Sequence, residues 1–93
     1  MNEETRVPDL FLQPQYISVE ADGLVYVPRI YGDERADGTW EGWIEFHPIG
    51  AGDIRATDRE TTQPNRRALE YWATGLEPVY YEGAFARAVV LPA

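Results

Sequence analysis

The sequence predicts an α+β fold in which a single antiparallel β-sheet of four to five strands is covered on one face by one α-helix. The expected order of elements is β-β-β-(β)-α-β. Runs of β-branched and aromatic residues flank Asp-Gly turns within residues 16–47, which is typical of antiparallel hairpins. One helical apolar pattern lies within residues 58–77, and a last apolar run occupies residues 79–91.

The length and composition indicate one folded domain. The 93 residues are 44% hydrophobic and 13% aromatic, which is enough apolar surface for a single core. The absence of cysteine excludes disulfides and thiolate metal sites. No apolar run approaches the roughly 20 residues of a membrane span, and residues 1–10 lack the apolar core of a signal peptide. We therefore expect a cytoplasmic protein without membrane contact.

The chain is strongly acidic. Sixteen carboxylates and eight basic residues give a formal net charge of −8. A negative field of this kind argues against direct binding to nucleic-acid phosphates. Solubility alone explains an acid excess, and the two alternatives are mimicry of nucleic acid toward a basic partner and adaptation to a high-salt cytoplasm.

Residues 1–15 are predicted to form an extended N-terminal leader, and residues 16–93 a single α+β domain. Two prolines, Pro8 and Pro14, flank the apolar run LFL. Because proline lacks an N–H and fixes φ, no long strand or helix is expected there. We expect Phe11 to pack on the core; the alternative is that the leader is a partner-binding peptide.

Asp22-Gly23 is predicted to be the turn of a tight β-hairpin within residues 16–31. Pro28 cannot donate a backbone hydrogen bond, so either regular pairing stops near Val27 or Pro28 points away from its neighbouring strand. The expected cross-strand pairs are Ala21 with Leu24, Val19 with Tyr26, and Ile17 with Pro28.

After a polar loop at residues 32–38, the next strand is predicted at residues 39–47, and Pro48 ends it. Alternation places its side chains on two opposite faces. The set expected to face the core is Trp40, Gly42, Ile44 and Phe46, and the set expected to face solvent or a partner is Glu41, Trp43, Glu45 and His47. A short fourth strand is expected at residues 54–57.

A helix is predicted from about residue 64 to residue 74. Thr61 or Thr62 is the expected N-cap, and Pro64 fits the first turn, where its missing N–H would have no partner in any case. The Gly-Leu-Glu-Pro sequence that follows is expected to end the helix. The apolar stripe that would cover the sheet is Ala68, Leu69, Trp72, Ala73 and Leu76.

Residues 79–91 are predicted to form a central strand of the sheet. Both faces of this segment are apolar, as in strands that are buried on two sides. Its small face would allow a helix to pack closely, and consists of Ala84, Ala86 and Ala88.

The sequence contains no complete catalytic or metal-binding set. His47 is the only histidine and shares a strand face with Glu45 and Glu41, so a carboxylate–imidazole pair for acid–base chemistry is possible. A metal site needs three or four converging ligands, which this pattern does not supply. A phosphate-binding glycine loop is also absent. We therefore expect a non-enzymatic protein without metal or cofactor.

The predicted helix start is the first candidate binding site. Backbone N–H groups and the helix dipole at such a terminus favour an anion, and arginine adds bidentate donors for carboxylate or phosphate. The alternative is structural: the threonines cap the helix and the arginines form surface ion pairs of little energetic weight. The candidate residues are Arg59, Thr61, Thr62, Asn65, Arg66 and Arg67.

The aromatic residues are the second candidate. They exceed what one small helix can cover, so some are expected on the uncovered sheet face, where Tyr and Trp would suit a protein interface. The alternative is a second core layer under the N-terminal leader. The proposed interface residues are Tyr26, Trp43 and Tyr81.

Over residues 16–90, the order of elements and the segment DGLVYVPRI resemble HicB-type antitoxins. The resemblance implies a partial RNase-H-like sheet with one covering helix, and an antitoxin-like regulatory role. The short motif with proline and glycine that this family carries after its second strand is replaced here by YGDERADG, so no functional residues are carried over.

Taken together, these patterns favour a small protein-binding or self-associating module. A module that binds a small anion or a phosphate ligand through residues 59–67 is the main alternative, followed by an antitoxin-like or nucleic-acid-mimicking regulator.

Overall fold

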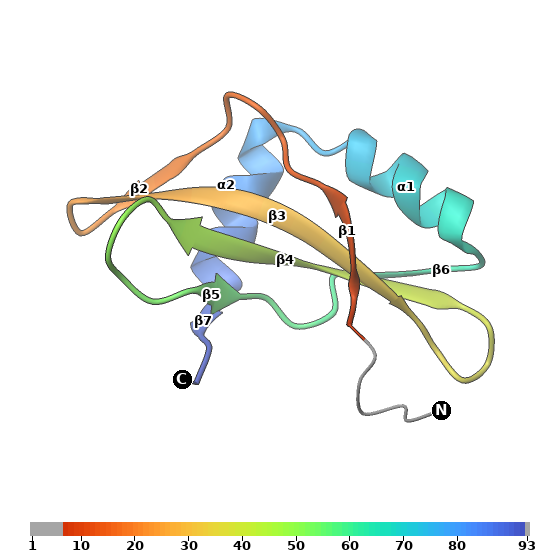
Figure 1. The fold of residues 1–93 in the computed structure, drawn as a ribbon. Coiled ribbons are helices and arrows are strands. Elements are labelled where there is room, and N and C mark those ends of the chain that lie inside the picture. The colour runs from red at the N-terminus through yellow and green to blue at the C-terminus, as the bar shows by residue number, and fades with distance from the viewer. Residues whose placement is uncertain (1–6, 93) are drawn as a thin grey trace.

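The computed structural model describes residues 7–92 and shows one antiparallel β-sheet of seven strands with two helices (Figure 1). The main path through the sheet is β1-β3-β4-β5-β7, with β2 paired to β3 and β6 paired to β4. The elements are β1 (Asp9–Leu12), β2 (Val19–Ala21), β3 (Leu24–Glu34), β4 (Trp40–Pro48), β5 (Arg55–Ala56), β6 (Thr61–Gln63), α1 (Arg66–Thr74), α2 (Pro78–Arg87) and β7 (Val89–Val90). The predicted α+β class with a single antiparallel sheet is confirmed, whereas the predicted four to five strands and one helix are too few.

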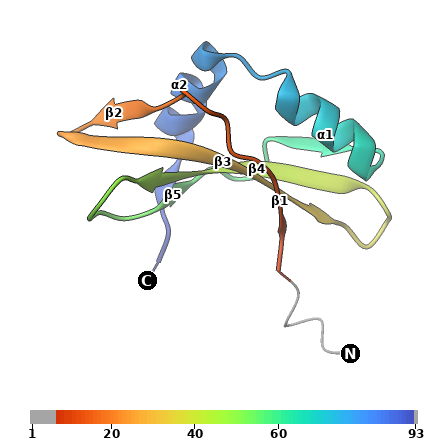
Figure 2. The same ribbon diagram turned by 45° about the horizontal axis from the view of Figure 1, so that its top comes forward.

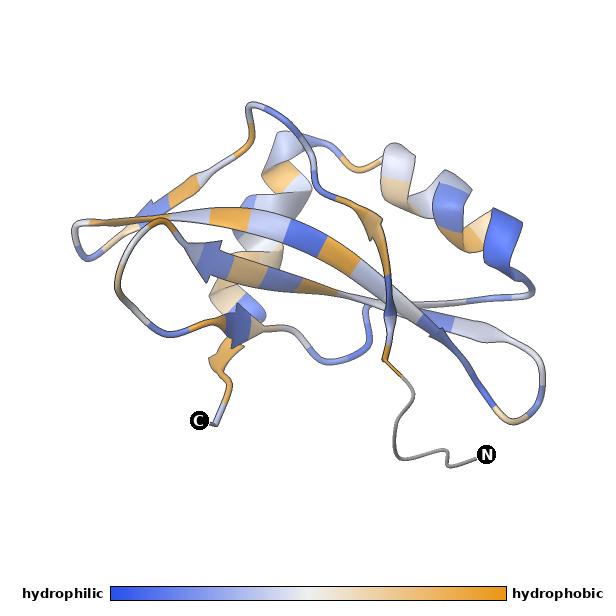
Figure 3. Ribbon diagram, viewed as in Figure 1, coloured by the Kyte–Doolittle hydropathy of each residue, from blue (hydrophilic) through white to orange (hydrophobic). Residues whose placement is uncertain are grey.

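The long hairpin of β3 and β4 forms the centre of the sheet. Its register runs without a break from the pair Tyr26–Pro48 to the pair Glu34–Trp40. Buried and half-buried residues alternate along the middle of both strands, and hydrophobic and hydrophilic segments alternate toward the end of β4 (Figure 3). Both helices lie on the same side of the sheet (Figure 2). The core between sheet and helices consists of Tyr26, Ile30, Ile44, Phe46, Ala73, Tyr81 and Ala84.

Two glycines leave the sheet without side chains at the point where α1 packs against it. Gly32 and Gly42 are direct cross-strand partners, and the fully buried Leu69 of α1 packs over them. A Cβ added at Gly42 would lie 2.7 Å from Leu69 Cδ1, and one added at Gly32 would lie 2.6 Å from Phe11 Cε1. Both positions therefore require glycine for a steric reason.

The hairpin around Asp22-Gly23 has the predicted pairs Ala21–Leu24 and Val19–Tyr26. The predicted partnership of Ile17 with Pro28 is wrong, because β2 begins only at Val19.

Pro28 points its backbone away from β4. The carbonyl of Val25 accepts a hydrogen bond of 2.8 Å from the N–H of Ile49, beside β4. Backbone groups of alternate residues in a strand point to opposite sides, so those of Pro28 point toward the other edge. There β1 ends at the pair Leu12–Ile30 and β2 starts at Val19–Tyr26, and Pro28 lies in the gap between them. The first of the two predicted options for Pro28 is the one observed, since the pairing of β3 with β2 ends at the pair Val19–Tyr26, next to Val27.

The N-terminal segment joins the sheet. β1 pairs with β3, and a register shift between Leu10 and Leu12 lets Phe11 pack against the core, as expected. The Phe11 ring meets Trp40 edge-on with a centroid distance of 5.9 Å. Residues 1–6 of the predicted leader lie outside the described part of the chain.

The predicted central strand at residues 79–91 is wrong. This segment forms α2 and the two-residue strand β7. Pro78 occupies the start of α2, where a proline is favoured because the first helical N–H has no partner within the helix. The side chains that face the sheet follow a spacing of three and four, and are Tyr81, Ala84, Phe85 and Ala88.

Replacing Gly32 with alanine should destabilise the protein by about 1–3 kcal/mol, because the added methyl overlaps Phe11 and Leu69 in a packed core. Urea denaturation followed by far-ultraviolet circular dichroism measures this change. The control is Gly83→Ala in α2, where the new Cβ meets only the end of Arg87 at 3.4 Å. This control should be neutral or stabilising by up to about 1 kcal/mol; equal losses in both variants would contradict the steric account of Gly32.

Candidate functional site

The predicted anion site at the helix start is divided between two elements. Thr61 and Thr62 lie in β6 and pair with Gly42 and Glu41 of β4. The predicted N-cap role of these threonines is therefore wrong. Asn65 caps α1 instead, because its side-chain oxygen accepts a 2.8 Å hydrogen bond from the N–H of Ala68.

Arg66 is held by groups of its own chain. Its guanidinium forms an ion pair with Asp9 of β1 and lies 3.8 Å from the Glu70 carboxylate. The same guanidinium is 4.5 Å from the centroid of the Phe11 ring and 5.3 Å from that of Trp40. Arg66 thus joins α1 to β1.

The side chains of Arg59 and Arg67 are exposed, and neither forms a hydrogen bond or an ion pair with another side chain within residues 7–92. Arg59 precedes β6, and Arg67 lies in the first turn of α1 beside a shallow hollow formed with Glu70, Tyr71 and Thr74. The anion-site hypothesis consequently depends on these two arginines, since Asn65 and Arg66 already have structural roles and the threonines belong to a strand.

A buried carboxylate connects the loop before β6 to α2. The Glu60 side chain is 9% exposed and accepts hydrogen bonds from the Tyr80 hydroxyl at 2.6 Å and from Arg87 Nη2 at 2.5 Å. Burial and the hydrogen bond to Glu60 raise the pKa of Tyr80 to about 12. The predicted strand at residues 79–91 hid this cluster, because Tyr80 and Arg87 lie on one face of a helix but on opposite faces of a strand.

Two of the three predicted interface residues are buried. Tyr26 is 2% exposed and faces α2, with its ring 5.0 Å from that of Phe85. Tyr81 is 1% exposed and lies on the inner side of α2. Their proposed interface role is wrong for the folded chain, because both point to the face that the helices cover. Trp43 points to the opposite face.

That opposite face, here called the open face, carries the sheet residues that point away from α1 and α2. None of the described helices covers it (Figure 2). Cross-strand partners in a sheet share a face, so the strand registers define its members. They are Leu10 of β1, Glu20 of β2, Val25, Val27, Arg29, Tyr31 and Asp33 of β3, Glu41, Trp43, Glu45 and His47 of β4, Ala56 of β5, Thr62 of β6 and Val89 of β7.

The middle of the open face is an aromatic row. Tyr31 and Trp43 are direct cross-strand partners, and their rings are stacked with a centroid distance of 6.3 Å and an interplanar angle of 19°. Leu10, which is 50% exposed, is the partner of Tyr31 on the other side. The row therefore crosses three strands.

A polar pair lies beside this row. His47 Nε2 and the Glu45 carboxylate are 2.9 Å apart, and their side chains are 16% and 21% exposed. Arg29 is the cross-strand partner of Glu45. The predicted carboxylate–imidazole pair is therefore present, with a guanidinium on the neighbouring strand.

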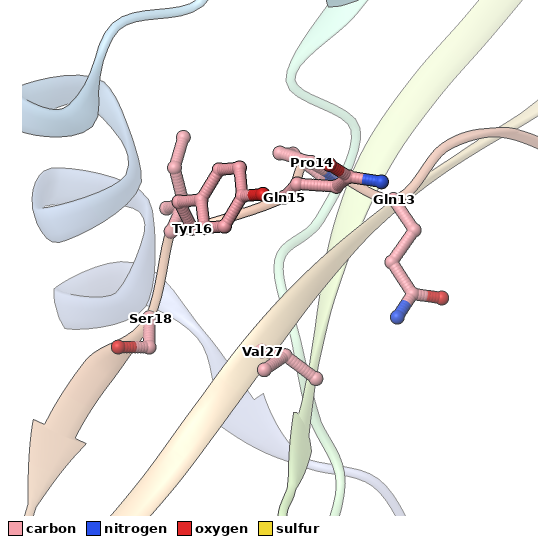
Figure 4. A pocket seen from close by; sticks show the side chains of 7 residues that line it. Gln13, Pro14, Gln15, Tyr16, Ser18 and Val27 are labelled. Carbon is pink, nitrogen blue, oxygen red and sulfur yellow. The ribbon is translucent and has the colours of Figure 1, made fainter.

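The loop between β1 and β2 runs beside β3 and borders an open pocket of about 680 Å³ (Figure 4). Val27 lines the pocket from β3, and Gln13, Gln15 and Ser18 supply its polar side chains. Tyr16 is fully exposed at this loop and has a φ of 64°. The lining carries no charged group that could perform acid–base chemistry or hold an anion.

Within residues 7–92, no group of three or more His, Asp and Glu side chains is arranged to hold a metal ion. None of the helices in this range has the length and apolar character needed to cross a membrane.

Replacing the Asn65 cap with alanine should destabilise the protein by about 1 kcal/mol, because the N–H of Ala68 loses its acceptor. Thr62→Ala is the matched control for the predicted cap, and should change stability by less than about 0.5 kcal/mol, because Thr62 is exposed in β6. Denaturant unfolding of both variants measures the difference. A larger loss for Thr62→Ala would contradict the assignment of the cap.

The Tyr80–Glu60 hydrogen bond should make stability sensitive to alkaline pH. The folded state retains the Tyr80 proton up to about pH 12, whereas an unfolded chain releases it near pH 10. The contribution of Tyr80 is therefore complete below about pH 10 and is lost as the pH rises toward 12. Unfolding free energies of the wild type and Tyr80→Phe should converge across this range, while exposed Tyr71→Phe should keep a constant difference from the wild type. A pH-independent difference for Tyr80→Phe would contradict this prediction.

Comparisons of the chain with models of protein families, with curated proteins and with solved structures found no match.

Proposed function

We propose that this chain is a protein-binding domain whose interface is the open face. The observation that carries the proposal is the Tyr31–Trp43 stack at the centre of a sheet face that no described helix covers. Tyrosine and tryptophan are enriched at the centre of interfaces and supply much of the binding energy there.

The layout of the open face supports this proposal. The aromatic row forms the apolar centre, while Val25 and Val27 lie on the same face beyond Arg29. Charged residues lie at both ends of it, with Arg29 and Glu45 on one side and Asp33 and Glu41 on the other. An apolar centre with a polar rim is the usual anatomy of a protein interface.

The rigidity of the hairpin also supports binding. β3 and β4 are paired over their whole length, so the positions of Tyr31 and Trp43 are fixed by backbone hydrogen bonds. A preformed surface loses less conformational entropy when a partner binds. The anion-binding alternative has weaker support, because Asn65 and Arg66 are engaged within the chain.

The proposal predicts that Trp43→Ala weakens association by at least about tenfold, as expected when a central interface tryptophan is removed. Association is measured in two ways: sedimentation velocity over a range of concentrations for self-association, and quantitative capture from a host extract for other partners. Tyr71→Ala is the matched control, because Tyr71 is 82% exposed on α1, on the other side of the sheet. Thermal unfolding verifies that both variants are folded.

Equal association of both variants and the wild type would contradict the open face as the interface. A monomer at all concentrations that also captures nothing would contradict protein binding altogether.

A further inference from the structure

Arg29 lies on the open face without a hydrogen-bond acceptor. Its Nε atom is buried and has no partner within the described residues. Glu45 is its cross-strand partner, but the Glu45 carboxylate lies 2.9 Å from His47 Nε2 instead. A buried donor that lacks an acceptor costs free energy, so an acceptor supplied from outside the chain would stabilise this position.

A comparison with Arg55 shows what Arg29 lacks. The Nε atom of Arg55 is also buried without a partner, but its guanidinium lies over two rings of the covered face, 5.4 Å from the Tyr26 centroid and 5.2 Å from that of Phe85. Aromatic faces attract a cation of this kind. No ring within residues 7–92 has this role for Arg29. The open face therefore contains an arginine whose interactions are incomplete.

The pocket beside Arg29 is uncharged. Val27, which is two residues from Arg29 and on the same face, lines it. Its polar side chains, Gln13, Gln15 and Ser18, are exposed and form no hydrogen bond with another residue in the described range. These side chains and Arg29 offer hydrogen-bond donors to one region of the open face, and the pocket lining contains no carboxylate.

Tyr16 lines the same pocket in a strained conformation. Its φ is 64°, in the left-handed region that bulky residues rarely adopt. Its side chain is fully exposed, so burial within the chain does not offset this strain. Strain of this kind concentrates at sites that contact ligands. The Tyr16 ring is therefore available to a partner at the edge of the open face.

The β3 edge argues against an added strand as the partner. Pro28 faces the gap between β1 and β2 and has no N–H. The backbone groups of its neighbours Val27 and Arg29 point to β4. An extended strand laid in this gap would find no backbone donor, whereas a segment recognised through side-chain donors needs none.

A neutral acceptor fits Arg29 better than a carboxylate does. Glu45 already lies opposite Arg29, and the whole chain has a formal net charge of −8. Both would repel an incoming carboxylate. Backbone carbonyls are uncharged acceptors, and a polyproline II segment leaves its carbonyls free because it has no internal hydrogen bonds.

We infer that the open face binds an uncharged, proline-rich segment in the polyproline II conformation. Its carbonyls accept hydrogen bonds from Arg29 and from the polar side chains of the pocket, and its rings pack against Tyr31, Trp43 and Tyr16. Surfaces lined by aromatic residues suit such segments, which are preformed and lose little entropy on binding. This inference rests on the proposed function, because it names the partner of the same face.

The dimensions of the open face agree with such a segment. Val27 and Tyr31 are four residues apart in β3, which corresponds to about 13 Å. A polyproline II segment rises about 3.1 Å per residue, so about four of its residues reach from the pocket to the aromatic row.

Three peptides of about 12 residues test the inference. The first consists of Ala-Pro-Pro repeats, the second of Glu-Pro-Pro repeats, and the third of flexible Ala-Gly-Ser repeats. Titration into the full-length protein is followed by NMR of the backbone amides and of the arginine Nε–H groups, with the Arg29 signal assigned from Arg29→Lys. We expect the first peptide to shift the Arg29 Nε–H and the amides of Val27 and Tyr31, the second to bind less tightly, and the third to cause no shift.

An arginine variant separates hydrogen bonding from charge. Arg29→Lys keeps the positive charge but lacks the Nε–H, so it should weaken binding of the Ala-Pro-Pro peptide by about threefold or more. Arg67→Lys is the matched control, since Arg67 is an exposed arginine of α1 on the other side of the sheet. Its affinity should equal that of the wild type.

A variant of Tyr16 separates binding from stability. Tyr16→Asn should weaken binding of the Ala-Pro-Pro peptide by about threefold or more, because a ring contact is lost. Its urea midpoint should be at least that of the wild type, because asparagine tolerates a positive φ.

The outcomes separate this inference from the proposed function. Tighter binding of the Glu-Pro-Pro peptide would overturn the uncharged partner, and equal binding of the Ala-Gly-Ser peptide would overturn the polyproline II conformation. Unchanged affinity of Arg29→Lys or of Tyr16→Asn would overturn the contact assigned to that residue. The absence of shifts with all three peptides overturns the inference as a whole, and the Trp43→Ala association measurements then judge the proposed function separately.

Discussion

The attachment of α1 to the sheet depends on how Leu69 packs against the paired glycines Gly32 and Gly42. Because neither strand has a Cβ at this point, the helix approaches the backbone of the sheet more closely than side chains would allow. This close approach brings Arg66 within reach of Asp9 and the Phe11 ring. β1 is therefore held at the edge of the sheet partly by the helix, and a chain end that contains two prolines becomes part of the fold.

The same arrangement divides the aromatic residues into two groups. The rings on the covered side pack edge-on or tilted in the core, as Tyr26, Phe46 and Phe85 do. On the open face, Tyr31 and Trp43 stack on each other rather than under a helix. A sheet that has both helices on one side keeps an ordered aromatic surface on the other, and this surface is the basis of the proposed interface.

Local chemistry made β4 and the hairpin of β2 and β3 predictable. Asp22-Gly23 determines the turn, and strict alternation along β4 assigns its two faces, so the positions of Ile44 and Trp43 followed from the sequence. The segment after Pro78 was not predictable in this way. A short apolar run with alanines suits a buried strand or a buried helix equally well, and only packing against the sheet selects the helix.

The candidate site could be predicted only in part, for a related reason. Thr61 and Thr62 have suitable side chains for a cap, but pairing with β4, about twenty residues away in the chain, places them in a strand. The exposure of Tyr26, Trp43 and Tyr81 depended on which face the helices cover. Because the segment that forms α2 was predicted to be a strand, the burial of Tyr26 and Tyr81 beneath it was not foreseen. Trp43 lies on the open face, and its interface role stays a prediction.

Pro28 has a consequence for solubility. The gap between β1 and β2 leaves part of the β3 edge without a neighbouring strand. An unpaired edge normally offers N–H donors to any extended chain that meets it, which is a route to aggregation. At this gap the outward-facing position is a proline, which has no donor to offer. Changes in the length of the loop at residues 13–18 would therefore expose no N–H donor of β3. We expect this loop to tolerate insertions.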